Sequence, residues 1–201
     1  MKQLVFYLLT LIPFGSFGQG KADFNKFQIG LNVSPDYCYI SIVGPNEIPK
    51  GGFTAGLNAA YNFKDDFGIE WGLQYSNKGF QTKIMNVTLI DPDPSAPSQV
   101  QFIYNLDFID IPLKANFYIS KKKNIRFFTS AGITTNVFLN AKQTNIFVYT
   151  DRTERETLNL TDNDIRKLNL TPSLSLGFDY TFNDNSQIRI EPILRYSVFK
   201  M

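Results

Sequence analysis

The feature that most constrains this chain is an alternation of apolar and polar side chains with a period of two. In "NLDFIDIPLKANFYI", residues 105–119, apolar side chains occupy every second position from Ile109 to Phe117. The positions between them hold Asp110, Pro112, Lys114 and Asn116. Successive side chains of a strand point to opposite faces, so this pattern predicts a strand with one apolar and one polar, charged face. Soluble barrels and membrane barrels both contain such strands.

The same alternation recurs along the chain and predicts seven strands. They cover residues 27–34, 53–62, 67–76, 100–117, 126–139, 168–182 and 188–198. Short polar turns at 64–66, 120–124 and 183–186 alternate with long connections at 44–51, 82–98 and 142–167. In an up-and-down meander every other connection lies at the same end, so one end has tight turns and the other has long loops. Outer-membrane barrels show this asymmetry.

The first residues, "MKQLVFYLLTLIPFGSFGQG", have the composition of a secretory signal peptide. The apolar run is interrupted by Pro13 and Gly15 and is shorter than the roughly 20 residues of a spanning helix. We therefore expect a signal peptide over 1–18, cleaved before Gln19, and one barrel domain over 19–201. No later segment has the length of a transmembrane helix, so the mature chain is expected to be secreted, periplasmic or inserted as strands.

Three features favour a membrane barrel over a soluble one. The polar face is rich in Gly, Ser, Thr and Asn and poor in the Lys and Glu of a solvated surface. Aromatic residues gather near strand ends, where an interfacial girdle would lie: Phe63, Phe67, Phe117, Tyr118, Tyr180 and Phe182. Charges of both signs share the polar face, which predicts ion pairs across a narrow lumen. These lumen residues are Glu70, Asp110, Lys114, Arg126, Asp179, Arg189, Glu191 and Arg195.

The predicted fold is thus an all-β, antiparallel, up-and-down transmembrane barrel, placed in the outer membrane and surrounded by its lipid. The alternative is a soluble lipocalin-like periplasmic carrier of a small apolar ligand, in which the apolar face would point inward. Asp107 and Asn105 lie on the wrong parity for the membrane arrangement. We expect either a β-bulge near Phe108 or a strand that has already risen beyond the membrane.

The sequence offers little for catalysis or metal binding. It contains no histidine, which excludes Ser-His hydrolase arrangements and His-based metal sites, and its single cysteine, Cys38, has no histidine partner. Acidic loops around Asp91 and Asp162 lack the spacing of a dedicated Ca²⁺ site. The near-neutral charge gives no footprint for nucleic acid. We expect a non-enzymatic protein with no cofactor, metal or catalytic residue.

With "FIDIPLKANFYI" on one strand and "IEWGLQYSNKGF" (69–80) before it, the chain resembles the PorT-like outer-membrane β-barrel family of Bacteroidetes-type Gram-negative bacteria. The blocks that carry the resemblance are "IDIPL" at 109–113 and "LQYSNKG" at 73–79. The resemblance implies an eight-stranded barrel and a partner-binding role in secretion or envelope assembly, with secretion or envelope proteins as partners. It implies no catalytic motif.

Seven strands leave the first and last strand with unpaired backbone groups, which lipid does not tolerate, and bacterial single-chain barrels have even strand numbers. The sequence therefore predicts a chain that lacks the last strand, as a truncated product or one completed by another chain. The alternative is a further strand over 36–43, separated from the first strand by a turn at Pro35.

Overall fold

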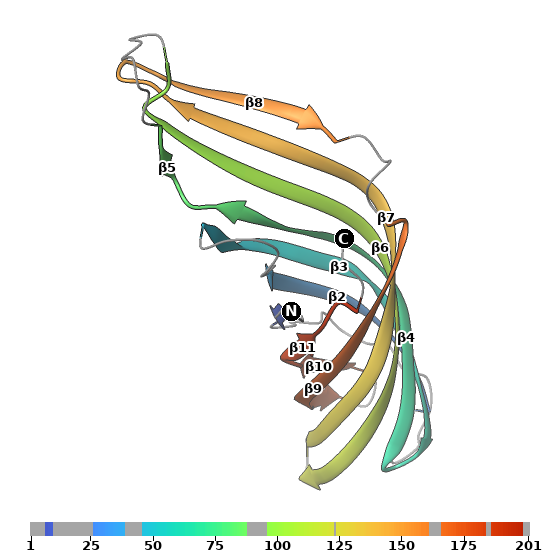
Figure 1. Cartoon of the computed structure of the whole chain (residues 1–201). Helices are drawn as coiled ribbons and strands as arrows, with labels where there is room; N and C mark the ends of the chain where they lie inside the picture. The colour runs from blue at the N-terminus through green and yellow to red at the C-terminus, as the bar shows by residue number, and fades with distance from the viewer. Residues whose placement is uncertain are drawn as a thin grey trace.

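The computed structural model describes residues 7–9, 26–38, 46–87, 96–122, 124–160, 166–183 and 186–198. These residues form one antiparallel sheet of eleven strands (Figure 1). The strands are β1 (Tyr7–Leu9), β2 (Phe27–Cys38), β3 (Glu47–Lys64), β4 (Phe67–Thr82), β5 (Met85–Asn86), β6 (Gln99–Lys122), β7 (Ile125–Val148), β8 (Thr153–Asn159), β9 (Leu168–Asn183), β10 (Ser186–Ile190) and β11 (Ile193–Arg195). Within this part of the chain no helix is long and apolar enough to cross a membrane.

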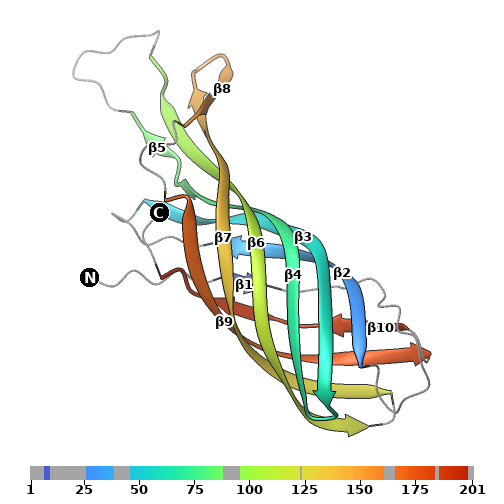
Figure 2. The ribbon, with the colours of Figure 1, turned by 90° about the vertical axis from the view of Figure 1, so that its right-hand side faces the viewer.

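The sheet has the predicted up-and-down topology. Strands β2, β3, β4, β6, β7 and β9 each pair with the next along the chain, apart from the small additions of β5 and β8. The predicted seventh strand is present in two pieces, β10 and β11, which both pair with β9. Strand β1 pairs with both β11 and β2 and lies between them. Figure 2 shows the main strands curving round to form the barrel wall. The predicted all-β antiparallel barrel fold is confirmed.

The apolar faces of the strands point outward and the polar faces point into the lumen. Leu113 on β6 and Leu176 on β9 are 58% and 65% exposed, whereas Asp110 and Asn116 are 0% exposed. In water this apolar band would be exposed to solvent, which is unfavourable, whereas lipid accommodates it. The alternative of a lipocalin-like calyx requires the opposite orientation and does not fit this structure.

Most of the predicted girdle aromatics lie on the outer surface at the turn end of the barrel. Phe63 stacks on Phe67, Phe67 contacts Phe117, and Tyr180 contacts Phe182. Tyr118 was predicted to join them, and this was wrong. Its side chain is buried in the lumen and donates a hydrogen bond to Asn62. The reason is parity, since Tyr118 lies on the same face of β6 as Asn116.

The polarity of the wall inverts near Phe108. On β6 the alternation continues without a break, but Leu106 and Phe108 are now the buried inward residues, and Asp107 points outward to accept a hydrogen bond from Tyr75. The bulge expected near Phe108 in this strand is wrong in its position: it lies in β7, where Asp107 pairs with Asn140 and Phe108 with Phe138, which leaves Leu139 as an extra residue. The strand itself fits the second expectation, because it continues beyond the apolar band.

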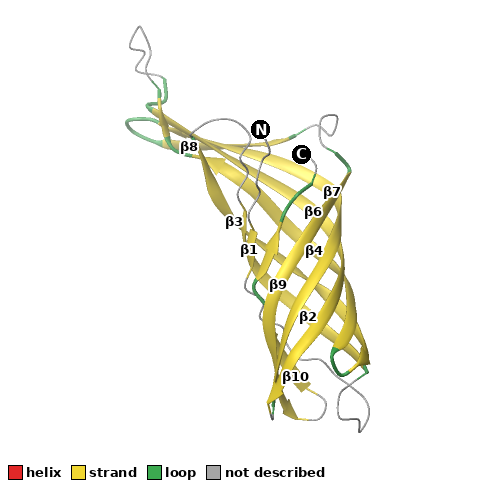
Figure 3. Cartoon of the chain, turned by 60° about the horizontal axis from the view of Figure 1, so that its bottom comes forward, coloured by secondary structure: helices red, strands yellow, loops and turns green. Residues whose placement is uncertain are grey.

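Beyond this inversion the sheet continues as an open extension that we call the blade. It consists of residues 78–82 of β4, strand β5, residues 99–108 of β6, residues 138–148 of β7, and strand β8. Figure 3 shows these strands projecting past the end of the barrel where the N- and C-termini are marked. Gly79 lies at the start of the blade with φ of 155°, and an added Cβ would overlap the carbonyl oxygen of Tyr104.

Two prolines lie within strands. Pro112 pairs with Thr134 on β7, but the register between β6 and β4 is interrupted from Ile111 to Pro112, so the missing N–H falls where that ladder is already broken. Pro35 lies inside β2 and pairs with Phe53 on β3. The alternative of a separate strand that begins after a turn at Pro35 is therefore wrong about the turn. The remainder of the alternative strand, 39–43, lies outside the described residues.

The seam of the barrel lies between β2 and the last strands. Tyr7 of β1 pairs with both Cys38 of β2 and Arg195 of β11, so the gap at this level is one strand wide. Towards the turn end, the side chains of Gln28 and Gln187 exchange hydrogen bonds across the seam. β1 falls within the predicted signal peptide. The rest of the segment 1–18 lies outside the described residues, so its cleavage stays a prediction. The missing last strand also stays a prediction.

Candidate functional site

The lower half of the lumen, at the turn end, holds six charged side chains in one network. The ammonium of Lys114 lies 2.9 Å from both Glu70 and Glu191. Arg189 pairs with Glu70 and, at 2.7 Å, with Asp179. Arg126 completes the network at 3.1 Å from Asp179. Three carboxylates thus meet three cations, each from an inward position that the alternation places on the polar face.

The upper half of the lumen holds a second group. Lys78 lies 2.6 Å from Asp110, which also accepts a hydrogen bond from Asn136. Asp36 accepts a hydrogen bond from Thr54 at 2.6 Å. Arg195 is 4% exposed and attracts both Asp36 and Asp110 electrostatically, although its Nε and Nη1 atoms have no hydrogen-bond partner among the described residues. Two carboxylates here balance two cations.

The structure thus places all eight predicted lumen residues inside the barrel, in two groups rather than one. Sequence reasoning missed Lys78 and Asp36. Lys78 has the same parity as Gln74 and Ser76, which indicates the same face of the strand. It lies beyond the predicted end of that strand. Asp36 shares a face with Asn32, but it lies beyond Ser34, where the predicted strand ended.

Aromatic rings fill space between these charges. Arg126 lies over Tyr118 with 3.6 Å to the ring centroid, and Arg189 lies over Phe128 at 4.3 Å. Burial of charges is tolerable only with partners of this kind. The network and the rings together obstruct the lumen, as expected for a barrel of about eight strands. Among the described residues there is no group of three or more side chains suited to hold a metal ion. The acidic loops around Asp91 and Asp162 lie outside them.

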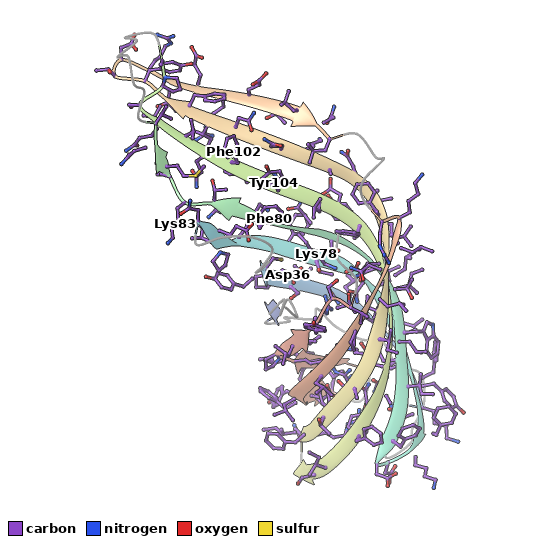
Figure 4. All side chains as sticks on the ribbon, in the orientation of Figure 1. Asp36, Lys78, Phe80, Lys83, Phe102 and Tyr104 are labelled. Atoms are coloured by element: carbon purple, nitrogen blue, oxygen red, sulfur yellow. The ribbon has the colours of Figure 1, made fainter. Side chains whose placement is uncertain are left out.

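On β4 and β6 the inner face of the blade, which continues the lumen wall, is apolar and aromatic. Leu106, Phe108 and Ala141 form a buried cluster with Phe138 and Leu160 against it. Further out, Phe80 of β4 stacks on Tyr104 of β6 with 4.4 Å between ring centroids. Figure 4 shows Phe80, Phe102 and Tyr104 on adjoining strands of the blade, above Lys78 and Asp36 at the mouth of the barrel. Polar lumen and aromatic blade are thus two distinct surfaces.

Comparison with known proteins identifies the family. Residues 17–198 match the model of the "Outer membrane protein beta-barrel domain" family. No curated protein matches the chain. A search of solved structures finds similarity to a major outer membrane protein from Thermus thermophilus, at 11% identity and a TM-score of 0.45 over 98% of this chain and 100% of that one.

Two further structures are similar at lower scores. One is the outer membrane protease OmpT from Escherichia coli, at 7% identity and a TM-score of 0.37 over 97% of this chain and 94% of that one. The other is the Ralstonia pickettii toluene transporter TbuX, at 8% identity and a TM-score of 0.30 over 98% of this chain and 89% of that one. Identities this low carry no activity over to this chain. The match of the family model to almost the whole chain, on a barrel with its apolar face outward, shows that the chain belongs to the outer membrane protein beta-barrel domain family.

Proposed function

We propose that this outer-membrane barrel is a non-enzymatic, partner-binding component in secretion or envelope assembly, and that its blade is the contact surface. The observation that carries this proposal is the inversion of polarity at Phe108. Beyond it, the strands keep pairing outside the lipid band, where a barrel wall no longer needs them. A rigid sheet held above the membrane with an aromatic inner face is suited to recognition by another protein.

The side of the membrane follows from the loops. The tight turns, such as Asp65 and Asp66 between β3 and β4, lie at the end opposite the blade. Outer-membrane barrels have short periplasmic turns, so the blade would project from the cell surface. The resemblance of "IDIPL" and "LQYSNKG" to PorT-like proteins supports a role in secretion, and the predicted signal peptide supports export.

The packed lumen argues against a passive pore. The ion pairs of Lys114 and Arg189 span it from β4, β6, β9, β10 and the segment after β10. Conductance at the nanosiemens level in planar bilayers would contradict this assignment. The ion pairs of the buried carboxylates Glu70, Asp110, Asp179 and Glu191 support a structural role for these residues rather than a catalytic one.

Site-specific photocrosslinking in intact cells tests the proposal. A photoreactive phenylalanine analogue would replace Phe102 on the inner face of the blade, and Leu176 on the lipid face would serve as the control position. We expect the same protein to be captured from Phe102 and from Leu158 of β8, and not from Leu176. Equal capture from both faces, or none from the blade, would remove the support for partner binding.

A further inference from the structure

Strand β8 is an open edge of the blade. Among the described residues it pairs with β7 alone, in an unbroken register from Lys142↔Asn159 to Val148↔Thr153. All seven of its residues are exposed. An edge strand of this kind presents unpaired backbone donors and acceptors to which another strand can add.

The phase of the β7–β8 ladder shows which backbone groups are open. Leu160 donates to Ala141 at 3.0 Å, and Tyr149 donates to Arg152 at 2.8 Å. In an antiparallel pair every second residue exchanges both hydrogen bonds with its partner strand, so 154, 156 and 158 face β7 in the same way as 152 and 160. The N–H and C=O groups of Thr153, Arg155 and Thr157 therefore point to the open edge.

The side chains of β8 carry an alternating charge pattern. Glu154 and Glu156 pair with Phe147 and Asn145 and share the inner face of the blade, while Arg155 lies on the outer face. Arg152 holds Glu154 at 2.7 Å. No ion pair joins Arg155 or Glu156 to another described residue. The open edge thus offers acidic, basic and acidic side chains in succession, two of them available to a partner.

The pattern opposes pairing with a second copy of the chain. Two copies joined edge to edge are related by a two-fold axis normal to the sheet, so facing residues come from the same face. When the two-fold axis passes next to Glu154, Arg155 or Glu156, that residue lies directly opposite the same residue of the second chain. Like charges directly opposite are destabilising. In these three registers the charges oppose self-association, but the edge remains open to a strand of complementary charge.

We propose that the β8 edge binds, by strand addition, an extended segment of a partner protein whose residues alternate basic, acidic and basic. The basic side chains would face Glu154 and Glu156, and the acidic one would face Arg155. Backbone hydrogen bonds to Thr153, Arg155 and Thr157 would supply affinity, and the charges would set register and choice of partner. This inference rests on the proposed partner-binding function and names the surface and the partner chemistry.

Fluorescent peptides binding to the purified, folded full chain in detergent test the proposal. One nine-residue peptide carries a central Thr-Lys-Glu-Lys-Thr, and a second carries the charge-inverted Thr-Glu-Lys-Glu-Thr. We expect the first to bind at least tenfold more tightly. The triple variant Glu154→Lys, Arg155→Glu, Glu156→Lys should reverse that preference. Equal binding of the two peptides, or a preference that the triple variant leaves unchanged, would overturn the proposal.

A matched pair at Thr157 tests the backbone contribution. Thr157→Pro removes an N–H from the open edge and leaves the ladder to β7 intact, whereas Thr157→Ala keeps that N–H. Binding of the Lys-Glu-Lys peptide should be lost in the proline variant and kept in the alanine variant, with both variants running as folded barrels on unboiled gels. Strand addition by a partner would be contradicted if both variants lost peptide binding or if both kept it. It would also be contradicted if the original chain formed a dimer that Thr157→Pro abolishes.

The two proposals can fail separately. If the triple variant still captures its partner through Phe102 in cells while the peptides show no charge preference, the blade binds a partner and the β8 edge is not the surface. If no partner is captured from Phe102 or Leu158 in the original chain but the peptide preference holds, the edge inference stands and the cellular role fails.

Discussion

Replacing Lys114 with Met removes the cation at the centre of the lower lumen network. Its ammonium lies 2.9 Å from Glu70 and 2.9 Å from Glu191, and its side chain is 7% exposed. Glu70 would keep Arg189 and the amide of Asn116, at 3.2 Å. Glu191 would keep only hydroxyl donors, Ser130 at 2.9 Å and Ser175 at 2.6 Å. The substitution therefore leaves one buried carboxylate without a cation.

Removing one partner of a buried ion pair costs about 3–5 kcal/mol. We expect a loss near the lower end, about 3 kcal/mol, because Glu70 retains Arg189. A second substitution, Glu191→Gln, neutralises the stranded carboxylate and should recover much of the loss, with a coupling energy of about 1–3 kcal/mol. Lys83, exposed after the end of β4, provides a control, and Lys83→Met should change the stability by less than about 0.5 kcal/mol.

Urea unfolding of the barrel in lipid vesicles measures these differences. The single tryptophan, Trp71, is 41% exposed on the outer face of β4, so its fluorescence reports loss of contact with lipid. Equal effects of Lys114→Met and Lys83→Met would show that Lys114 faces water and that the lumen assignment is incorrect. A double variant no more stable than Lys114→Met would refute the argument that the stranded Glu191 causes the loss.

Other substitutions test the remaining features of the fold. Gly79→Ala should expose the blade to limited proteolysis, because the added Cβ would overlap the Tyr104 carbonyl, whereas Gly30→Ala, with open space around the position, should not. Leu113→Arg on the lipid face should cost about 2–4 kcal/mol in vesicle unfolding. Leu158→Arg on the blade should cost little, and equal losses would place the blade in lipid. Mass spectrometry of the mature protein should find Gln19 at its N-terminus, and a retained 1–18 segment would contradict the predicted cleavage.

The strands and the two faces of the wall could be predicted from the order of the residues. The alternation of side chains is a local property of an extended backbone, so Ile109 to Phe117 could be assigned to one face and Asp110 and Lys114 to the other without any tertiary information. The unequal loops likewise determined which end of the meander has tight turns. This is why the barrel and the inward placement of all eight lumen charges followed from the residues alone.

Which charged side chains contact each other, and where the wall leaves the lipid, depends on the tertiary structure. Lys114 and Glu191 are 77 residues apart, and their contact depends on closure of the wall through several strand registers. The parity of their positions predicts that both side chains point inward, but it does not predict how far along the barrel axis each one lies. The bulge at Leu139 and the position of Pro35 within β2 depend in the same way on the neighbouring strand, because a ladder can absorb a proline or an extra residue only where its partner allows it.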